Sequence, residues 1–218
     1  MNVHHLFVNG EEVKDLIIPN DVTNIRDFAF IGCSYLNSIT LHKNVTSIGS
    51  YAFSHCDGLK TISVPSNVTS IGHGAFTECN GVTSLRIEDS EQMLKVGDNC
   101  LPTSLTTLYI GRSFKSLNEY YRQYENNNYL PFSYLKQITS LTFGKECTSI
   151  CDPAFYDCNE ITAIHCLGTT PPKYDAYWGF EPPFSNTVYE TATLYIPRGS
   201  AETYQISGFG LYFSLNNS

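Results

Sequence analysis

A 23-residue repeat is the feature that most constrains what this chain can fold into. Three segments align without a gap, and they begin at Leu16, Ile39 and Ile62. A later unit returns to the same phase at Leu141. A repeat of this length is one small structural unit that cannot bury its apolar side alone, so neighbouring units must stack. The repeat therefore predicts a solenoid with a continuous core.

Each unit carries the same order of apolar and turn-forming positions. Ile39 and Leu41 flank a polar residue, which predicts a short strand with one buried face. Val45 and Ile48 predict a second extended stretch, and Gly49 permits a sharp turn after it. A small residue followed by Phe then predicts a short helical turn directed into the core. This pair recurs as Ala52-Phe53 and Ala75-Phe76.

Two units depart from this pattern. In the fourth unit, Val96 lies two residues late, and Cys100 stands where the second and third units have Ala. In the fifth unit, Phe114 and Leu117 fit the two inward positions of the second stretch. We therefore expect both units to keep the solenoid path despite their irregular spacing.

An insertion interrupts the repeat near residues 118–130. The distance from Leu108 to Leu141 is 33 residues instead of 23. Insertions in solenoids form loops on one face, often the face that binds a ligand. Tyrosine presents a rigid amphipathic ring that suits recognition, but the same rings can also pack on the side of the solenoid. The candidate ligand-binding tyrosines of this insertion are Tyr120, Tyr121, Tyr124 and Tyr129.

The repeats suggest one domain over residues 1–218. Residues 1–15 contain Asn9-Gly10, a strong hairpin signal, and are expected to form an N-terminal cap. Residues 16–163 hold the repeats, and residues 164–218 hold a last repeat and a C-terminal cap. Capping units cover the apolar ends of a solenoid, so two caps favour a complete small domain.

The repeated outline Ile-x-x-x-Ala-Phe-x-x-Cys-x-x-Leu-x-x-Ile-x-Leu-Pro resembles the BspA-type leucine-rich repeats. The stretch 192–204 resembles the closing unit of such proteins, and the resemblance covers roughly residues 6–213. It implies a right-handed curved leucine-rich-repeat solenoid that is secreted or attached to a cell surface. It also implies adhesion or host-protein binding, and it carries over no catalytic residues because the family shares none.

Composition excludes two further classes of function, nucleic-acid binding and membrane insertion. A net charge of -8 without a basic run argues against nucleic acid, which is bound by clustered Lys and Arg. The sequence has no apolar stretch of the roughly 18 residues that membrane insertion needs. We expect a monomeric, non-enzymatic module that binds a protein or a glycan at the cell surface or outside the cell. The alternatives are a structural spacer within a longer array and, because no leader is recognisable, a cytoplasmic protein.

The outward positions of the first strand give the second candidate site. Strand residues that share one repeat position must form a row across the sheet. This row becomes larger and more aromatic toward the C-terminal half, and Tyr and Arg are frequent interface anchors. A plain solvated sheet is the alternative. The candidate ligand-binding residues in the row are Arg86, Tyr109, His165 and Tyr195.

Eight cysteines raise the question of disulfides or metal. Four of them share one repeat position, which predicts a column of buried thiols, since free Cys behaves as a small apolar residue. Disulfides remain the alternative for an exported protein. The spacing of Cys147, Cys151, Cys158 and Cys166 lacks the paired C-x2-C knuckles of structural zinc sites, so we expect no cofactor. The four cysteines of the column are Cys33, Cys56, Cys79 and Cys158.

Overall fold

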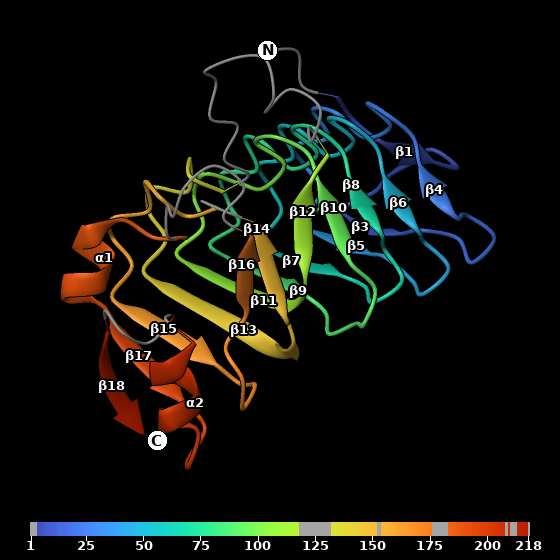
Figure 1. Ribbon diagram of the computed structural model, residues 1–218. Coiled ribbons are helices and arrows are strands. Elements are labelled where there is room, and N and C mark those ends of the chain that lie inside the picture. Colours follow the sequence, from blue (N-terminus) through green and yellow to red (C-terminus); the bar gives the residue numbers. More distant parts are fainter. Residues whose placement is uncertain are drawn as a thin grey trace, which may run out of the picture.

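The chain forms a solenoid in which successive turns lie side by side in sequence order (Figure 1). Its structure is a computed structural model. The described residues are 4–117, 132–151, 154–175, 183–207, 209 and 213–217. Buried apolar side chains form one cluster that runs from Ile18 to Phe213, as the stacking of repeats requires.

The first strand of each repeat joins a parallel sheet. β3 (Asp15–Ile17) pairs with β5 (Ser38–Thr40), and a seven-stranded sheet follows in later repeats. Inward residues of its strands are buried and outward residues are more exposed, as the period-2 pattern predicted. The strands of this sheet are β7 (Thr61–Val64), β9 (Ser84–Ile87), β11 (Thr107–Arg112), β13 (Ser140–Glu146), β15 (Ala163–Cys166), β17 (Thr193–Ile196) and β18 (Ser214–Asn217).

The second extended stretch of each repeat also forms parallel sheets. Val96 pairs with Ile71, which confirms that Val96 occupies the repeat position despite its delay. The strands of the five-stranded sheet are β4 (Asn24–Ile25), β6 (Ser47–Ile48), β8 (Ser70–Ile71), β10 (Leu94–Val96) and β12 (Phe114–Ser116). A further pair consists of β14 (Ser149–Cys151) and β16 (Lys173–Asp175).

The fifth unit corrects one prediction. Ser116 pairs with Val96 and is buried, so it fills the position expected for Leu117. The side chain of Leu117 is 38% exposed. The pairing of β11 with β13 is also irregular, because β13 has one extra residue opposite the stretch between Ile110 and Arg112.

Tight turns follow the second strand of each repeat, and we call this part of the solenoid the turn side. Ala52 N donates to Gly49 O and Cys56 N donates to Phe53 O, so these turns are single i to i+3 turns. The short helical turns expected here are therefore tight turns, and the described α-helices, α1 (Asn186–Thr191) and α2 (Ala201–Ile206), lie in the C-terminal part. Between the turns, Phe53 stacks between Phe30 and Phe76 at centroid distances of 5.1 and 5.4 Å.

One turn position adopts a left-handed backbone in three successive repeats. Gly32, His55 and Glu78 have φ values of 73°, 60° and 58°. A left-handed backbone costs a residue with a Cβ roughly 1–2 kcal/mol, while Gly has more conformational freedom to lose on folding. The position is therefore one where Gly is the favoured residue.

We expect Glu78→Gly to raise the free energy of unfolding by about 0.5–1 kcal/mol, because relief of strain exceeds the added chain entropy. Urea unfolding of the variant and of the unchanged chain measures the difference in the free energy of unfolding. Thr77→Gly is the matched control at a neighbouring position outside the left-handed set, and it should lower stability by about the same amount. Equal losses in both variants would contradict this account of the turn.

The predicted column of thiols is confirmed. Cys56, Cys79 and Cys158 each donate from Sγ to a backbone carbonyl of the preceding repeat, at 3.2, 3.0 and 3.1 Å. Their acceptors are the carbonyl oxygens of Phe30, Phe53 and Phe132. All eight cysteines are free thiols, and Cys151 is more exposed than the other seven. These three thiols of the column therefore each link one repeat to the one before it.

The burial of cysteine thiols also makes the stability of the solenoid sensitive to alkaline pH. Desolvation raises the pKa values of Cys100, Cys158 and Cys166 to about 12, against about 8.5 for a thiol in an unfolded chain. Above about pH 8.5 the unfolded thiols ionise while the folded ones stay protonated, so unfolding is favoured.

We expect the free energy of unfolding to fall as pH rises from about 8.5 toward 12, with no contribution from these thiols below that window. Urea unfolding at a series of pH values measures the fall. Cys100→Ala restores the residue found at this position in other repeats and should reduce the slope. An identical slope in this variant would show that other groups cause the alkaline loss.

Both ends of the described chain differ from the repeats. β1 (Phe7–Val8) and β2 (Glu11–Glu12) form the predicted antiparallel hairpin, with Asn9 and Gly10 at positive φ in its turn. At the other end, α1 precedes β17 and α2 precedes β18. The hydroxyl of Tyr204 in α2 donates to Gly168 O at 2.8 Å, which fastens this helix to the solenoid. The assignment of the two ends as caps stays a prediction.

Candidate functional site

The outward row of the strand sheet exists as the repeat predicts. Arg86 pairs with Tyr109, and Tyr109 pairs in turn with Thr142 on the next strand. Thr142 pairs with His165, and His165 pairs with Tyr195. We call these five residues the strand row. A parallel sheet with one strand per repeat places equivalent residues side by side, so the row follows directly from the period.

A carboxylate fixes the first two members of the strand row. Arg86 Cζ lies 3.7 Å from the centroid of the Tyr109 ring, a cation–π contact. Arg86 Nη2 donates to Asp89 Oδ2 at 2.9 Å, and the Tyr109 hydroxyl donates to both Asp89 oxygens at 2.8 Å. Burial and the hydrogen bond to Asp89 raise the pKa of Tyr109, so its hydroxyl remains a donor at neutral pH.

Two glycines leave room for this arrangement. A Cβ atom at Gly111 would lie 2.6 Å from Asp89 Cα, and one at Gly144 would lie 2.7 Å from the Tyr109 hydroxyl oxygen. Both distances are shorter than atoms tolerate, so the chain after β9 packs against β11 and β13 only because these side chains are missing. The glycines thereby set the position of Asp89 and, through it, of Arg86 and Tyr109.

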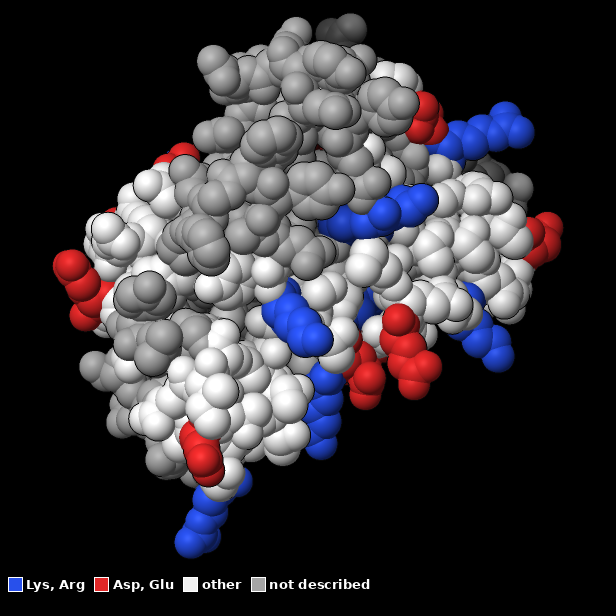
Figure 2. Space-filling view, in the orientation of Figure 1, with Lys and Arg blue, Asp and Glu red and all other residues white. Residues whose placement is uncertain are grey.

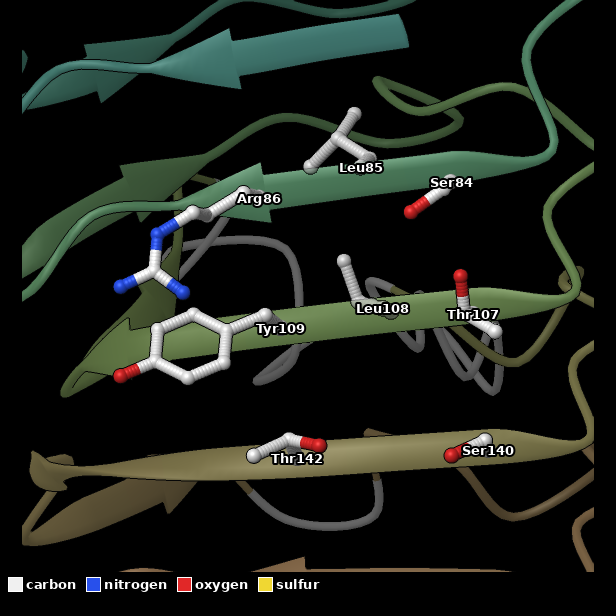
Figure 3. Close-up of a pocket in the computed structure, with 8 residues that line it drawn as sticks. All are labelled: Ser84, Leu85, Arg86, Thr107, Leu108, Tyr109, Ser140 and Thr142. Carbon is white, nitrogen blue, oxygen red and sulfur yellow. The ribbon is translucent and has the colours of Figure 1, made fainter.

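A shallow hollow of about 230 Å³ lies over β9, β11 and β13 (Figure 3). Figure 3 shows Arg86, Tyr109 and Thr142 along one side and a column of hydroxyl residues along the other. These hydroxyl residues are Ser84, Thr107 and Ser140, which pair across neighbouring strands. The hollow thus offers an aromatic face, a guanidinium group and several hydroxyls to one ligand.

A second stack lies at the other end of the strand row. The rings of His165 and Tyr195 are stacked, with centroids 4.4 Å apart and planes inclined by 7°. Both side chains are half-buried, so part of each ring faces solvent. Thr142 stands alone between this stack and the Arg86–Tyr109 pair.

The structure thus joins the four candidate residues of the row into two pairs on one sheet face. The candidate residues Tyr120, Tyr121, Tyr124 and Tyr129 lie outside the described residues, and their role stays a prediction. Sequence reasoning missed Asp89, although an acidic residue three positions after Arg86 was a usable signal. It also did not single out Thr142 or the hydroxyl column as candidate ligand-binding residues.

The charges visible on one face of the molecule are mixed. Figure 2 shows the described Lys and Arg side chains of this face interspersed with Asp and Glu rather than gathered into one patch. Within the described ranges, His, Cys, Asp and Glu form no group of three that is suited to a metal ion. Within the same ranges, helices are too short and too polar to span a membrane.

Comparisons with known proteins agree with the repeat architecture. A model of the BspA type leucine rich repeat region matches in six copies over residues 4–130 and 127–171. No curated protein matches the chain.

Solved structures of leucine-rich repeat proteins are also similar to the chain, including the following two. A leucine-rich repeat protein from Bacteroides ovatus ATCC 8483 is 18% identical, with 92% of this chain and 76% of that chain covered and a TM-score of 0.30. A leucine rich cell surface protein from Faecalibacterium prausnitzii A2-165 is 15% identical, with 94% and 79% covered and a TM-score of 0.24. The repeat model spans more than half of the sequence, and the chain therefore belongs to the family of proteins with BspA-type leucine-rich repeats.

Proposed function

We propose that this chain is a non-enzymatic recognition module that binds a protein or glycan ligand through the strand row and the hollow beside it. The observation that carries the proposal is the fixed arrangement of Arg86, Asp89 and Tyr109 on a sheet of seven strands. Binding surfaces gain affinity when their anchors are already ordered, because less side-chain entropy is lost on association.

The chemistry of the site suits binding better than catalysis. Arg86 and Asp89 form an ion pair with side chains 50% and 39% exposed, and such a pair contributes little stability. Its role is instead to orient the Tyr109 ring. Asp89 accepts hydrogen bonds from both neighbours, so it is engaged in positioning rather than poised to transfer a proton to a substrate.

We further propose that the module works outside the cell or on its surface, because BspA-type repeats are common in bacterial surface proteins. An adhesive role follows if the ligand belongs to another cell or to its secretions. The tyrosine-rich insertion at 118–130 is a second proposed contact region, and its deletion should weaken binding while the solenoid stays folded.

A binding panel tests the proposal. The purified chain is applied to immobilised neutral polysaccharides, glycoproteins and extracellular-matrix proteins, and retention is measured by biolayer interferometry. We expect at least one immobilised ligand to bind, and Tyr109→Ser or His165→Ser to weaken that binding at least about tenfold, the loss typical of an interface anchor. The matched control is Tyr51→Ser, which removes an exposed aromatic ring from the turn side.

The outcomes separate the proposal from its alternative. Binding that depends on Tyr51 and not on Tyr109 would place the ligand on the turn side and contradict the proposed face. Absence of binding to the whole panel would favour a structural spacer within a longer array. Circular dichroism and urea unfolding of each variant confirm that a loss of binding is not a loss of fold.

A further inference from the structure

The strand row contains one gap in an otherwise continuous series of flat groups. Arg86, Tyr109, His165 and Tyr195 carry planar groups, whereas Thr142 between them is small. The five residues lie on consecutive strands β9, β11, β13, β15 and β17. A planar group is therefore missing at the one position where β13 would supply it.

The rings on both sides of Thr142 turn a face toward this gap. The guanidinium of Arg86 on β9 lies over one face of the Tyr109 ring, so we infer that the other face lies on the side of β13. Tyr195 on β17 covers one face of the nearly parallel His165 ring, so the remaining face also lies on the side of β13. We call the part of the hollow over Thr142, which has Tyr109 on one side and the strand of His165 on the other, the Thr142 slot.

The width of the Thr142 slot follows from strand spacing. Neighbouring strands lie about 4.8 Å apart, so the backbones of Tyr109 and His165 are separated by about 9.6 Å. A flat aromatic ring in van der Waals contact with both walls needs only about 7–8 Å. A pyranose chair carries hydrogens on both faces and is thicker, so it fills the slot better than an aromatic side chain does.

The surroundings of the slot supply the polar contacts that a sugar needs. Thr142 forms its floor, and Ser140 and Thr107 line the adjoining hollow. Hydroxyl groups both donate and accept hydrogen bonds, and buried sugar hydroxyls need such partners. The charge of Arg86 is already paired with Asp89, and the chain carries a net charge of -8, so the surroundings favour a neutral sugar over an acidic one.

We propose that the Thr142 slot binds one neutral hexopyranose ring of a glycan, held between Tyr109 and His165 with its hydroxyls on the hydroxyl column. The inference rests on the proposed function of the strand row and names its ligand class. One ring in a shallow site should bind weakly, with a dissociation constant on the order of 1 mM, and longer glycans should gain contacts along the row.

Saturation-transfer NMR of the whole chain tests the slot directly. The probes are methyl α-D-glucopyranoside, methyl α-D-mannopyranoside and methyl β-D-galactopyranoside, with p-cresol as a flat aromatic probe. We expect transfer to the ring protons of at least one glycoside and weaker transfer to p-cresol. Thr142→Trp fills the slot with an indole and should abolish transfer, while His165→Ala removes one wall and should weaken binding about tenfold.

The matched control is Thr40→Trp, which places the same side chain in the same outward repeat position on β5, away from the slot. Transfer that survives Thr142→Trp, or is lost equally in Thr40→Trp, would overturn the inference. Preference for p-cresol, or no transfer to any glycoside, would also overturn it. In either case the proposed function still stands if a ligand from the panel depends on Tyr109, so the two failures are distinguishable.

Discussion

Phe53→Ala should lower the free energy of unfolding by about 3–5 kcal/mol, measured by urea denaturation. The Phe53 side chain is fully buried and stacks between Phe30 and Phe76, so it links three successive repeats. Its loss removes the transfer free energy of the ring and leaves a cavity that rigid neighbouring turns cannot close. In a solenoid each repeat is stabilised by its neighbours, so the substitution weakens the packing against both the preceding and the following repeat.

Phe28→Ala is the matched control for this prediction. Phe28 is 54% exposed and stacks on Tyr51 at 5.5 Å on the outside of the same turns. Its removal should cost less than about 1 kcal/mol, because surface changes leave no cavity. Similar losses in the two variants would contradict the view that the inner ring column holds the repeats together.

Arg112→Met should cost about 2–5 kcal/mol of stability for a different reason. The Arg112 side chain is fully buried, and its guanidinium donates to the carbonyl oxygens of Glu88, Val68 and Pro65 at 3.0, 2.8 and 2.9 Å. These acceptors belong to two earlier repeats, so one side chain joins three turns of the solenoid. A buried carbonyl without a donor costs about 1–3 kcal/mol, and the variant removes the Arg112 donors of Glu88 O and Val68 O, while Pro65 O still accepts from Val68 N.

Arg26→Met is the control, because Arg26 is exposed and its replacement should change stability by no more than about 0.5 kcal/mol. Arg112→Lys keeps the charge but loses the planar fork, so it should recover only part of the stability. Both comparisons use urea unfolding at neutral pH. A loss below about 1 kcal/mol for Arg112→Met would show that other donors replace the guanidinium.

The repeat let the sequence predict most of the fold. Once Leu16, Ile39 and Ile62 set the period, strand register, inward positions and the column of thiols followed, since a solenoid converts sequence spacing into spatial neighbours. Even the late Val96 was placed correctly, because its pairing partner is fixed by the repeat. The same repeat period also predicted that the residues of the strand row lie side by side.

The details that the sequence did not predict arise where the chain leaves the repeat. In the fifth unit Ser116 is buried and Leu117 is exposed, whereas the apolar spacing of the sequence favoured Leu117 as the inward residue. Charged side chains are ordinarily solvated, so the burial of Arg112 at the end of β11 was unexpected. The hydrogen bonds of Asp89 depend on the path allowed by Gly111 and Gly144, which becomes evident only in three dimensions.

A map of amide chemical shifts in the 15N-labelled chain tests most directly whether the strand row binds the ligand. Spectra are recorded with and without the methyl hexopyranosides and with short fragments of any polysaccharide that the panel identifies. We expect the shifts to concentrate in β11, β13 and β15, centred on Tyr109, Thr142 and His165. Shifts concentrated in the turns around Phe28 and Tyr51 instead would contradict this expectation, because the ligand would then bind the opposite side of the solenoid.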